Sequence, residues 1–179
     1  MGTKVLITGE PGSGKTTAIK RIVEKLGDRA VGFWTEEVRD PKTKKRTGFR
    51  IVTTDGKKRI FASKIFTSKK LVGSYGVNVQ YFEDIAIPIL EKAIKEARKD
   101  RRKVIVIDEI GKMELFSKKF RDLVRQIFYD DRLNVVATIP VRDVHKVVGE
   151  IRRLPGAIHI HLDKSNRDFI PDEVVQLFD

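Results

Sequence analysis

Short apolar runs alternate with amphipathic segments along most of the chain. Residues 4–8, 104–107 and 133–139 are largely apolar, which predicts strands buried on both faces of a sheet. Residues 157–162 are expected to form a last strand. Apolar positions at helical spacing predict helices over residues 15–26, 83–101, 143–153 and 171–178 and in a segment that Ser117 caps. This alternation predicts an α/β fold with a mostly parallel central sheet flanked by helices.

The middle of the chain departs from this alternation. Residues 30–38 read as a strand, and residues 48–54 and 59–62 read as antiparallel strands on either side of the hairpin dipeptide Asp55-Gly56. We therefore expect an antiparallel β-hairpin region inserted into the α/β pattern. Pro88 is expected to kink the helix predicted over 83–101 or to mark a later start.

The chain shows no internal repeat and no linker long enough to separate two units. Its 179 residues suit one compact domain, so residues 1–179 are expected to form a single domain. No apolar run approaches the ~20 residues that would span a bilayer. The sequence has no cysteine, which excludes disulfides and thiolate metal sites. A cytoplasmic protein, most simply a monomer, is the expectation.

The charge balance is strongly basic, with a formal net charge of +12. Residues 39–59 hold nine basic side chains against Asp40 and Asp55, so this segment is a possible nucleic-acid contact. The alternative is a charge-rich surface of a heat-adapted, thermostable protein, which a content of 35% charged residues also fits. We favour that alternative because no nucleic-acid-binding motif accompanies the charge.

A glycine-rich motif at residues 9–16 is the strongest indication of function in the sequence. It follows a predicted strand, opens a predicted helix and matches G-x-x-x-x-G-K-[ST] in full. Its residues are Gly9, Glu10, Pro11, Gly12, Ser13, Gly14, Lys15 and Thr16. Glycines let the backbone curl around an anion, and the N–H groups at the helix start then point at phosphate. This P-loop, or Walker A motif, predicts binding of a nucleoside triphosphate with Mg²⁺.

Three side chains of this motif have expected contacts. Lys15 should place its ammonium against the β- and γ-phosphates, and the Thr16 hydroxyl should ligate Mg²⁺. Thr17 should donate to the α-phosphate. Glu10 is unusual beside a polyphosphate, so its carboxylate is expected to point outward.

A second pair of candidate residues follows the buried run 104–107. Asp108 and Glu109 form a Walker B-like end of that strand, and alternation along a strand predicts that their carboxylates diverge. We assign Asp108 to the metal and Glu109 to orienting or deprotonating the attacking water. Alternatively, Glu109 only pairs with Lys112 or caps the following turn.

Several longer stretches make the pattern more specific. The run 107–116 (IDEIGKMELF) joins GFWTEEVR at 32–39, VGSYGV at 72–77, ATIPV at 137–141 and NRD at 166–168. Together with residues 9–17, they resemble the THEP1-type nucleoside-triphosphatase family, which includes the human cancer-related nucleoside triphosphatase. The resemblance covers essentially the whole chain.

The resemblance implies a RecA-like P-loop architecture and an enzyme of the hydrolase class. It implies slow, Mg²⁺-dependent hydrolysis of ATP and GTP, and of CTP, UTP and TTP, to the diphosphate and phosphate. Asn166 and Arg167 belong to the family-like pattern and follow the last strand, so they are expected to contact the nucleotide.

Other candidates have an ordinary structural explanation beside a functional one. Thr138 ends a strand and would sense the γ-phosphate or simply end that strand. Arg142 would neutralise transition-state charge, although a surface arginine is the commoner case. Phe33 and Trp34 are expected in the core rather than against a base. His159 and His161 are expected to share one strand face without forming a metal site.

Two other functions remain open. A nucleotide or nucleoside kinase also uses a P-loop, although a carboxylate set to activate water favours hydrolysis. A nucleic-acid-stimulated ATPase would use the basic segment 39–59.

Overall fold

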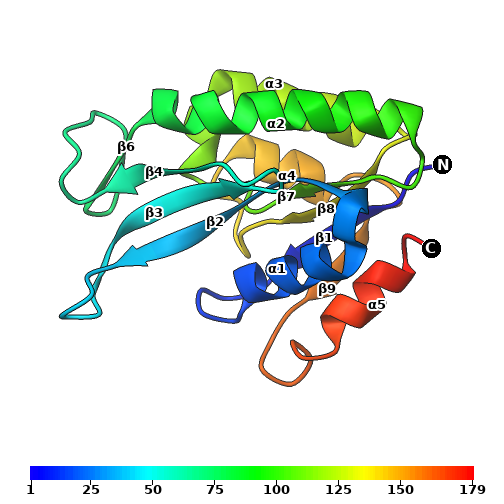
Figure 1. The fold of residues 1–179 in the computed structure, drawn as a ribbon, viewed down its shortest axis with the longest axis horizontal. Helices are drawn as coiled ribbons and strands as arrows, with labels where there is room; N and C mark the ends of the chain where they lie inside the picture. Colours follow the sequence, from blue (N-terminus) through cyan, green and yellow to red (C-terminus); the bar gives the residue numbers. More distant parts are fainter.

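The computed structural model describes residues 1–179 and contains one nine-stranded mixed sheet (Figure 1). The strand order is β5-β6-β4-β3-β2-β7-β8-β1-β9. The strands are β1 (Lys4–Thr8), β2 (Ala30–Arg39), β3 (Arg46–Thr53), β4 (Lys58–Ser63), β5 (Leu71–Val72), β6 (Tyr75–Val77), β7 (Val104–Ile107), β8 (Asn134–Thr138) and β9 (Ile158–His161). The helices are α1 (Lys15–Leu26), α2 (Val79–Lys99), α3 (Lys118–Tyr129), α4 (Lys146–Arg152) and α5 (Ile170–Gln176), with 3₁₀ turns η1 (Gly27–Arg29) and η2 (Glu114–Phe116).

The sheet has a parallel half and an antiparallel half. Strands β2, β7, β8, β1 and β9 make four parallel pairings, while β2, β3, β4, β6 and β5 make four antiparallel ones. The predicted α/β fold and inserted hairpin are therefore confirmed. The antiparallel half is larger than expected because β5 and β6 extend it around the turn at Gly73. These two strands were not predicted, since each spans only two or three residues.

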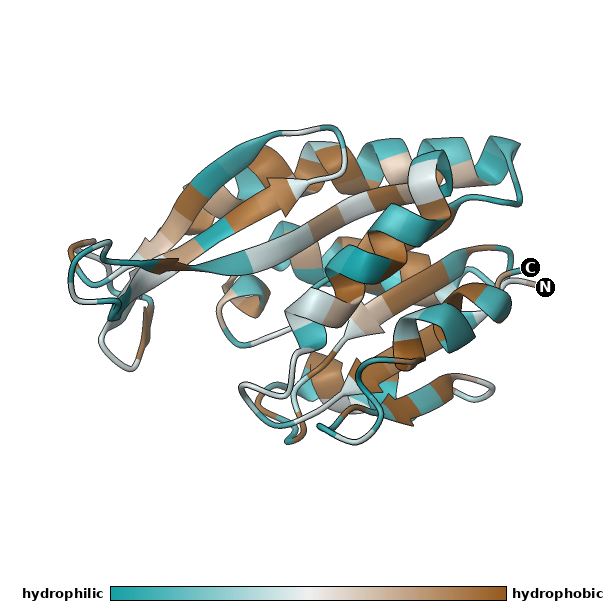
Figure 2. Cartoon of the chain, turned by 60° about the horizontal axis from the view of Figure 1, so that its bottom comes forward, coloured by the Kyte–Doolittle hydropathy of each residue, from teal (hydrophilic) through white to brown (hydrophobic).

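Helices cover both faces of the sheet. Helices α2, α3 and α4 share one hydrophobic cluster with the sheet, and α1 and α5 share a second cluster on the opposite face (Figure 1). The central strands and the inward helix faces are hydrophobic, whereas the outward helix faces are polar (Figure 2). No helix is both long enough and apolar enough to span a bilayer.

Two predicted helix starts are wrong. Helix α2 begins at Val79 and continues through Pro88, so a later start at this proline is excluded. The Asn78 side chain accepts a hydrogen bond from the Tyr81 backbone N–H and caps the helix. Helix α4 begins at Lys146 rather than at residue 143, because His145 Nδ1 accepts from the Val147 N–H and acts as the cap.

The parallel half brings the predicted chemistry to one edge of the sheet. The register pairs Ile7 with Thr138 and Ile107 with Ala137, so β1, β7 and β8 end at the same level. The P-loop follows β1, Asp108 and Glu109 follow β7, and Thr138 ends β8. Parallel strands place their carboxyl ends together, which is where ligands bind in open α/β sheets.

Candidate functional site

The P-loop has the backbone that an anion site needs. Gly12 and Gly14 have φ of 83° and 98°, a left-handed region that side chains with a Cβ rarely adopt. Helix α1 begins at Lys15, and the residue before it, Gly14, supplies no side-chain cap. The N–H groups at the start of α1 are therefore available to a phosphate. Ser13 Oγ is buried within this loop without a hydrogen-bond partner.

Lys15 and Glu109 face each other across the loop. Lys15 Nζ lies 3.8 Å from Glu109 Oε2, with side-chain exposures of 13% and 27%. Burial raises the pKa of Glu109, and the neighbouring Lys15 ammonium opposes that rise. Glu109 therefore pairs with Lys15, and the alternative pairing with Lys112 is absent from the structure.

Asp108 is the buried centre of the site. It accepts hydrogen bonds from Thr16 Oγ1 at 2.9 Å and from Thr138 Oγ1 at 2.5 Å. Burial raises the pKa of Asp108, while these hydroxyls and the Thr35 backbone stabilise its charged form. A carboxylate and a hydroxyl in contact beside a phosphate loop are the oxygen donors that Mg²⁺ prefers. Thr16 and Asp108, the residues expected to hold the metal, therefore supply donors that suit Mg²⁺.

The two carboxylates have different partners. Strand β7 ends at Ile107, so Asp108 and Glu109 lie just beyond the strand. Asp108 contacts Thr16 and Glu109 contacts Lys15. Both acids therefore reach neighbouring residues of the P-loop.

The site lies in a cleft of about 910 Å³. Most of the P-loop lines it, including Glu10, Pro11 and Thr17, all of which are exposed. The outward orientation expected for the Glu10 carboxylate stays a prediction. A cleft of this size exceeds what a metal ion and three phosphates need, since pockets of ~300–1,000 Å³ hold whole cofactor-sized ligands.

Two other segments complete the cleft, and of their residues only Arg142 was a candidate site residue. One comprises Pro140, Val141, Arg142 and Val144 after β8. The other, which we call the hairpin wall, comprises Thr35, Glu36 and Glu37 of β2 and Arg46, Phe49 and Arg50 of β3. The basic segment 39–59 and the family-like run at 32–39 contained these residues. Only the hairpin register, which pairs Glu36 with Arg50 and Glu37 with Phe49, brings them to the site.

Asn166 and Arg167 lie in the loop after β9. The Asn166 side chain is used within that loop, because Nδ2 donates to the His161 carbonyl at 2.8 Å and Oδ1 accepts from the Asp163 N–H at 2.9 Å. The Arg167 side chain packs beside Gly14 of the P-loop. Neither residue lines the cleft.

The remaining candidates divide between core and surface. Thr138 is fully buried at Asp108, and Phe33 is fully buried in the core. Trp34 is partly buried, and its Nε1 donates to Glu36. Arg142 is exposed at the cleft. His159 and His161 are exposed on the edge strand β9, and no cluster of three or more metal-ligating side chains occurs in the structure.

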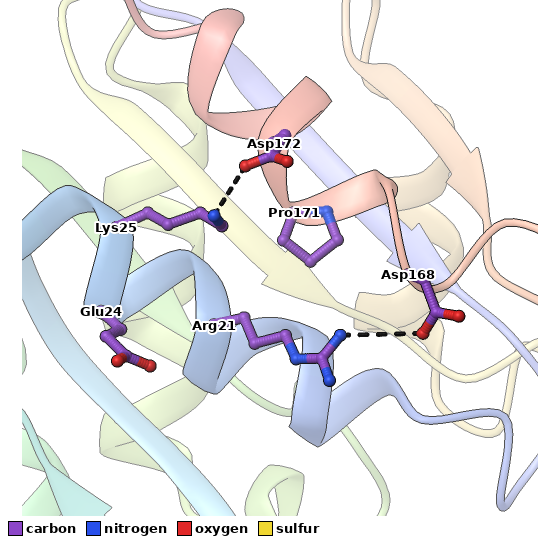
Figure 3. A pocket seen from close by; sticks show the side chains of 6 residues that line it. All are labelled: Arg21, Glu24, Lys25, Asp168, Pro171 and Asp172. Atoms are coloured by element: carbon purple, nitrogen blue, oxygen red, sulfur yellow. Dashed lines mark ion pairs between the residues drawn. The ribbon is translucent and has the colours of Figure 1, made fainter.

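A separate hollow lies between α1 and α5 and has no P-loop residue in its lining (Figure 3). Arg21 and Lys25 of α1 point toward Asp168 and Asp172, forming ion pairs of 3.7 and 2.7 Å. Its lining includes no hydrophobic residue. These contacts join α5 and the preceding loop to α1, on the opposite side of the P-loop from the hairpin wall.

The similarity to known proteins agrees with this geometry. A family model described as NTPase matches residues 4–175. The chain is 74% identical over 176 residues to nucleoside-triphosphatase THEP1 of Aquifex aeolicus, covering 98% of this chain and 99% of that protein. The crystal structure of THEP1 from the hyperthermophile Aquifex aeolicus superposes with a TM-score of 0.94, at 69% identity and with 99% of each chain covered.

A more distant relative has the same fold. The solution structure of a human cancer-related nucleoside triphosphatase superposes with a TM-score of 0.81 at 34% identity, covering 98% of this chain and 97% of the human one. The resemblance that the sequence motifs indicated is thus confirmed, along with the P-loop architecture. This chain belongs to the NTPase family, the nucleoside-triphosphatases of the THEP1 type, which are hydrolases of phosphoric anhydrides.

Proposed function

We propose that this protein is a slow, Mg²⁺-dependent nucleoside-triphosphatase that converts ATP, GTP, CTP, UTP and TTP to the diphosphate and phosphate. The observation that carries the proposal is the meeting of two pairs at one sheet edge. Thr16 contacts Asp108 at 2.9 Å, and Lys15 contacts Glu109 at 3.8 Å. The first pair suits a metal ion, and the second suits a phosphate with an attacking water.

Each residue has a distinct task in this proposal. The P-loop N–H groups and Lys15 bind the β- and γ-phosphates, and Thr16 and Asp108 hold Mg²⁺, which supplies charge neutralisation when bound. Glu109 orients the attacking water and accepts its proton. Release of Lys15 from Glu109 toward phosphate would free the carboxylate for that role, because the two now neutralise each other.

Glu109 has the environment that a general base needs. Its pKa is raised by burial, and the ideal pKa of a base lies near the working pH. Thr138 positions Asp108 through the 2.5 Å hydrogen bond rather than reaching the substrate itself. Thr17 would donate to the α-phosphate. The Arg167 side chain packs beside Gly14, outside the lining of the cleft. We place the nucleoside beside Arg167, with Asn166 shaping the loop that carries this arginine.

We propose broad base preference on the basis of the same geometry. The Asn166 amide is already used within its own loop, and the Arg167 guanidinium can stack on any base. No other polar side chain is assigned to a base edge. We further propose a cytoplasmic, thermostable monomer.

The test is phosphate release from the five triphosphates with Mg²⁺. Lys15→Ala should abolish release by weakening nucleotide binding. Glu109→Gln should lower kcat by about 100-fold or more, because it removes the base and keeps the side-chain size. Glu24→Gln, which changes an exposed acid of α1, is the matched control and should retain wild-type release. Wild-type turnover in Glu109→Gln would remove Glu109 from its proposed role.

A kinase is the second candidate, and the extent of the cleft beyond Glu109 favours it. Added nucleosides and nucleoside monophosphates would then raise turnover and become phosphorylated. A screen that yields only diphosphate and phosphate would exclude this activity.

Stimulation by nucleic acid is the third candidate, and the same assay tests it with an RNA titration at two salt concentrations. The structure neutralises part of the basic segment 39–59, since Glu37 pairs with Arg39 and Arg46 and Glu36 pairs with Arg50. We therefore expect release to be indifferent to RNA.

A further inference from the structure

The cleft extends to one side of the proposed phosphate site. Across the sheet edge, the loops follow the strand order β2, β7, β8, β1 and β9. The P-loop after β1 therefore lies between the loop after β9, which carries Arg167, and the hairpin wall beyond β2. The cleft is lined by the hairpin wall but not by Arg167.

The P-loop sets the direction in which the phosphate chain of a bound triphosphate runs. Lys15 and Glu109 mark the γ-phosphate end of the site. If the nucleoside lies beside Arg167, as proposed above, it leaves the P-loop on the β9 side. The hairpin wall and residues 140–144 then border open cleft on the γ-phosphate side.

The lining of that open part is cationic and partly aromatic. The Arg50 Nε is fixed by Glu36 Oε1 at 3.0 Å, which leaves both Nη groups without a hydrogen bond. Arg142, in the segment after β8, also lines the cleft, is exposed and forms no ion pair. Phe49 is partly exposed beside them, with the Arg46 guanidinium 5.1 Å from its ring centroid. Arginine forks bind phosphates, and an aromatic face stacks on a planar ring.

The acids of the hairpin wall hold these arginines in place rather than repel an anion. Glu36 accepts hydrogen bonds from Trp34 and Arg50 and pairs with Lys20 at 3.0 Å. These partners keep the Glu36 carboxylate charged and occupied. Because its charge is already balanced, it orients Arg50 without cancelling the attraction of Arg142 for a phosphate.

We propose that this part of the cleft binds a second ligand of the nucleoside-monophosphate class. Arg50 and Arg142 contact its phosphate, and Phe49 packs against its base. The inference rests on the proposed function for the position of the γ-phosphate, but the binding it describes requires no hydrolysis. It identifies the chemical class that belongs beside the transferable phosphoryl group.

Trp34 supplies a reporter, because it is the only tryptophan in the chain. Its Nε1 donates to Glu36 Oε2 at 3.1 Å, and the other Glu36 oxygen holds Arg50. A phosphate that draws Arg50 toward it should therefore change Trp34 fluorescence. The measurement uses Glu109→Gln protein saturated with Mg²⁺ and ADP, so that the P-loop is filled and nothing turns over.

We expect AMP and GMP each to give a saturable change in this protein, at lower concentrations than inorganic phosphate or adenosine. Arg142→Gln, which leaves the Trp34–Glu36–Arg50 contacts intact, should raise the Kd about tenfold. Arg50→Gln removes the contact that the reporter depends on and should abolish the fluorescence change. Arg21→Gln, at the separate hollow of Figure 3, is the matched control and should leave the Kd unchanged.

Three results would overturn the inference. They are binding of the monophosphate only by displacement of ADP, equal binding of inorganic phosphate and AMP, and an unchanged Kd in Arg142→Gln. Saturable AMP binding in a protein that releases no phosphate from any triphosphate would contradict the proposed function alone. Phosphate release without AMP binding would contradict this inference alone.

Discussion

At the scale of single residues, the site is built from carboxylates with different partners. Asp108 accepts two hydroxyl hydrogen bonds, and Glu109 pairs with Lys15. Glu114 is buried, with 6% of its surface exposed, and burial together with the charges of Glu109 and Asp108 raises its pKa well above the usual range. These surroundings favour the neutral form of the Glu114 acid, since no cation offsets its burial.

Glu114 predicts a pH dependence of stability. Because its pKa is higher in the folded state than in the unfolded state, the unfolded chain loses this proton first as the pH rises. Its contribution to the free energy of unfolding therefore decreases from the unfolded value of about 4.3 up to the folded pKa. The Glu114→Gln variant has no ionisable group at this position and does not lose this contribution as the pH rises. Its free energy of unfolding minus that of the wild type should therefore increase between pH 5 and pH 8.

Guanidinium unfolding at both pH values measures this difference. Glu173→Gln, which changes an exposed acid of α5, should give the same small difference at each pH. A Glu114→Gln effect that is equal at pH 5 and pH 8 would show that Glu114 is ionised in the folded protein.

Much of the site could be predicted at this scale, because the P-loop and the Asp108–Glu109 pair are contiguous in sequence. The hairpin wall could not be predicted from the sequence, since its residues come from two strands. Glu36 and Arg50 meet only through cross-strand pairing, and a bulge between Phe49 and Arg50 alters the pairing of β3 with β4. A pattern read along one strand does not contain that register.

At the scale of elements, the boundaries that could be predicted are those marked by a residue with a strong conformational preference, such as glycine. Helix α1 begins and ends where expected because Gly14 and Gly27 flank it, and β7 matches its apolar run. The start of α2 was predicted at residue 83 rather than at Val79, where Asn78 caps the helix, and Pro88 does not break it. The apolar face of α2, which includes Phe82, Ala86 and Ile89, packs on both sides of the proline and outweighs the lost hydrogen bond.

Helix α3 offers a test of capping. Ser117 Oγ accepts from the Phe120 N–H at 3.0 Å and donates to Glu83 Oε2 at 2.6 Å, which joins α3 to α2. Ser117→Ala should lower the free energy of unfolding by about 1–2 kcal/mol in guanidinium titrations. Ser117→Thr keeps the hydroxyl and should lose less. Equal losses in the two variants would mean that packing at this buried position, rather than the cap, sets the effect.

At the scale of the whole molecule, the sheet separates two hydrophobic layers of unequal size. The α2–α3–α4 layer contains 30 buried residues, and the α1–α5 layer contains 14. The P-loop helix belongs to the smaller layer. Within the larger one, the Phe82 ring lies 5.8 Å from Phe33, 5.3 Å from Phe61 and 5.2 Å from Phe120, measured between centroids.

Phe82 should therefore matter for global stability. Phe82→Ala removes a ring that is 1% exposed and should lower the free energy of unfolding by about 3–5 kcal/mol. Phe169→Ala is the matched control, because that ring is 50% exposed and its loss should cost at most about 1 kcal/mol. Similar losses in the two variants would contradict the view that the larger layer holds the fold together.

The central claim is that Glu109 activates water while its P-loop neighbours bind the nucleotide. Single-turnover phosphate release from bound Mg²⁺–ATP, measured in wild type and Glu109→Gln together with the ATP Kd, tests it most directly. We predict that release falls by about 100-fold or more while the Kd stays within about threefold of wild type. Release at the wild-type rate, or a loss explained entirely by weaker ATP binding, would contradict the account.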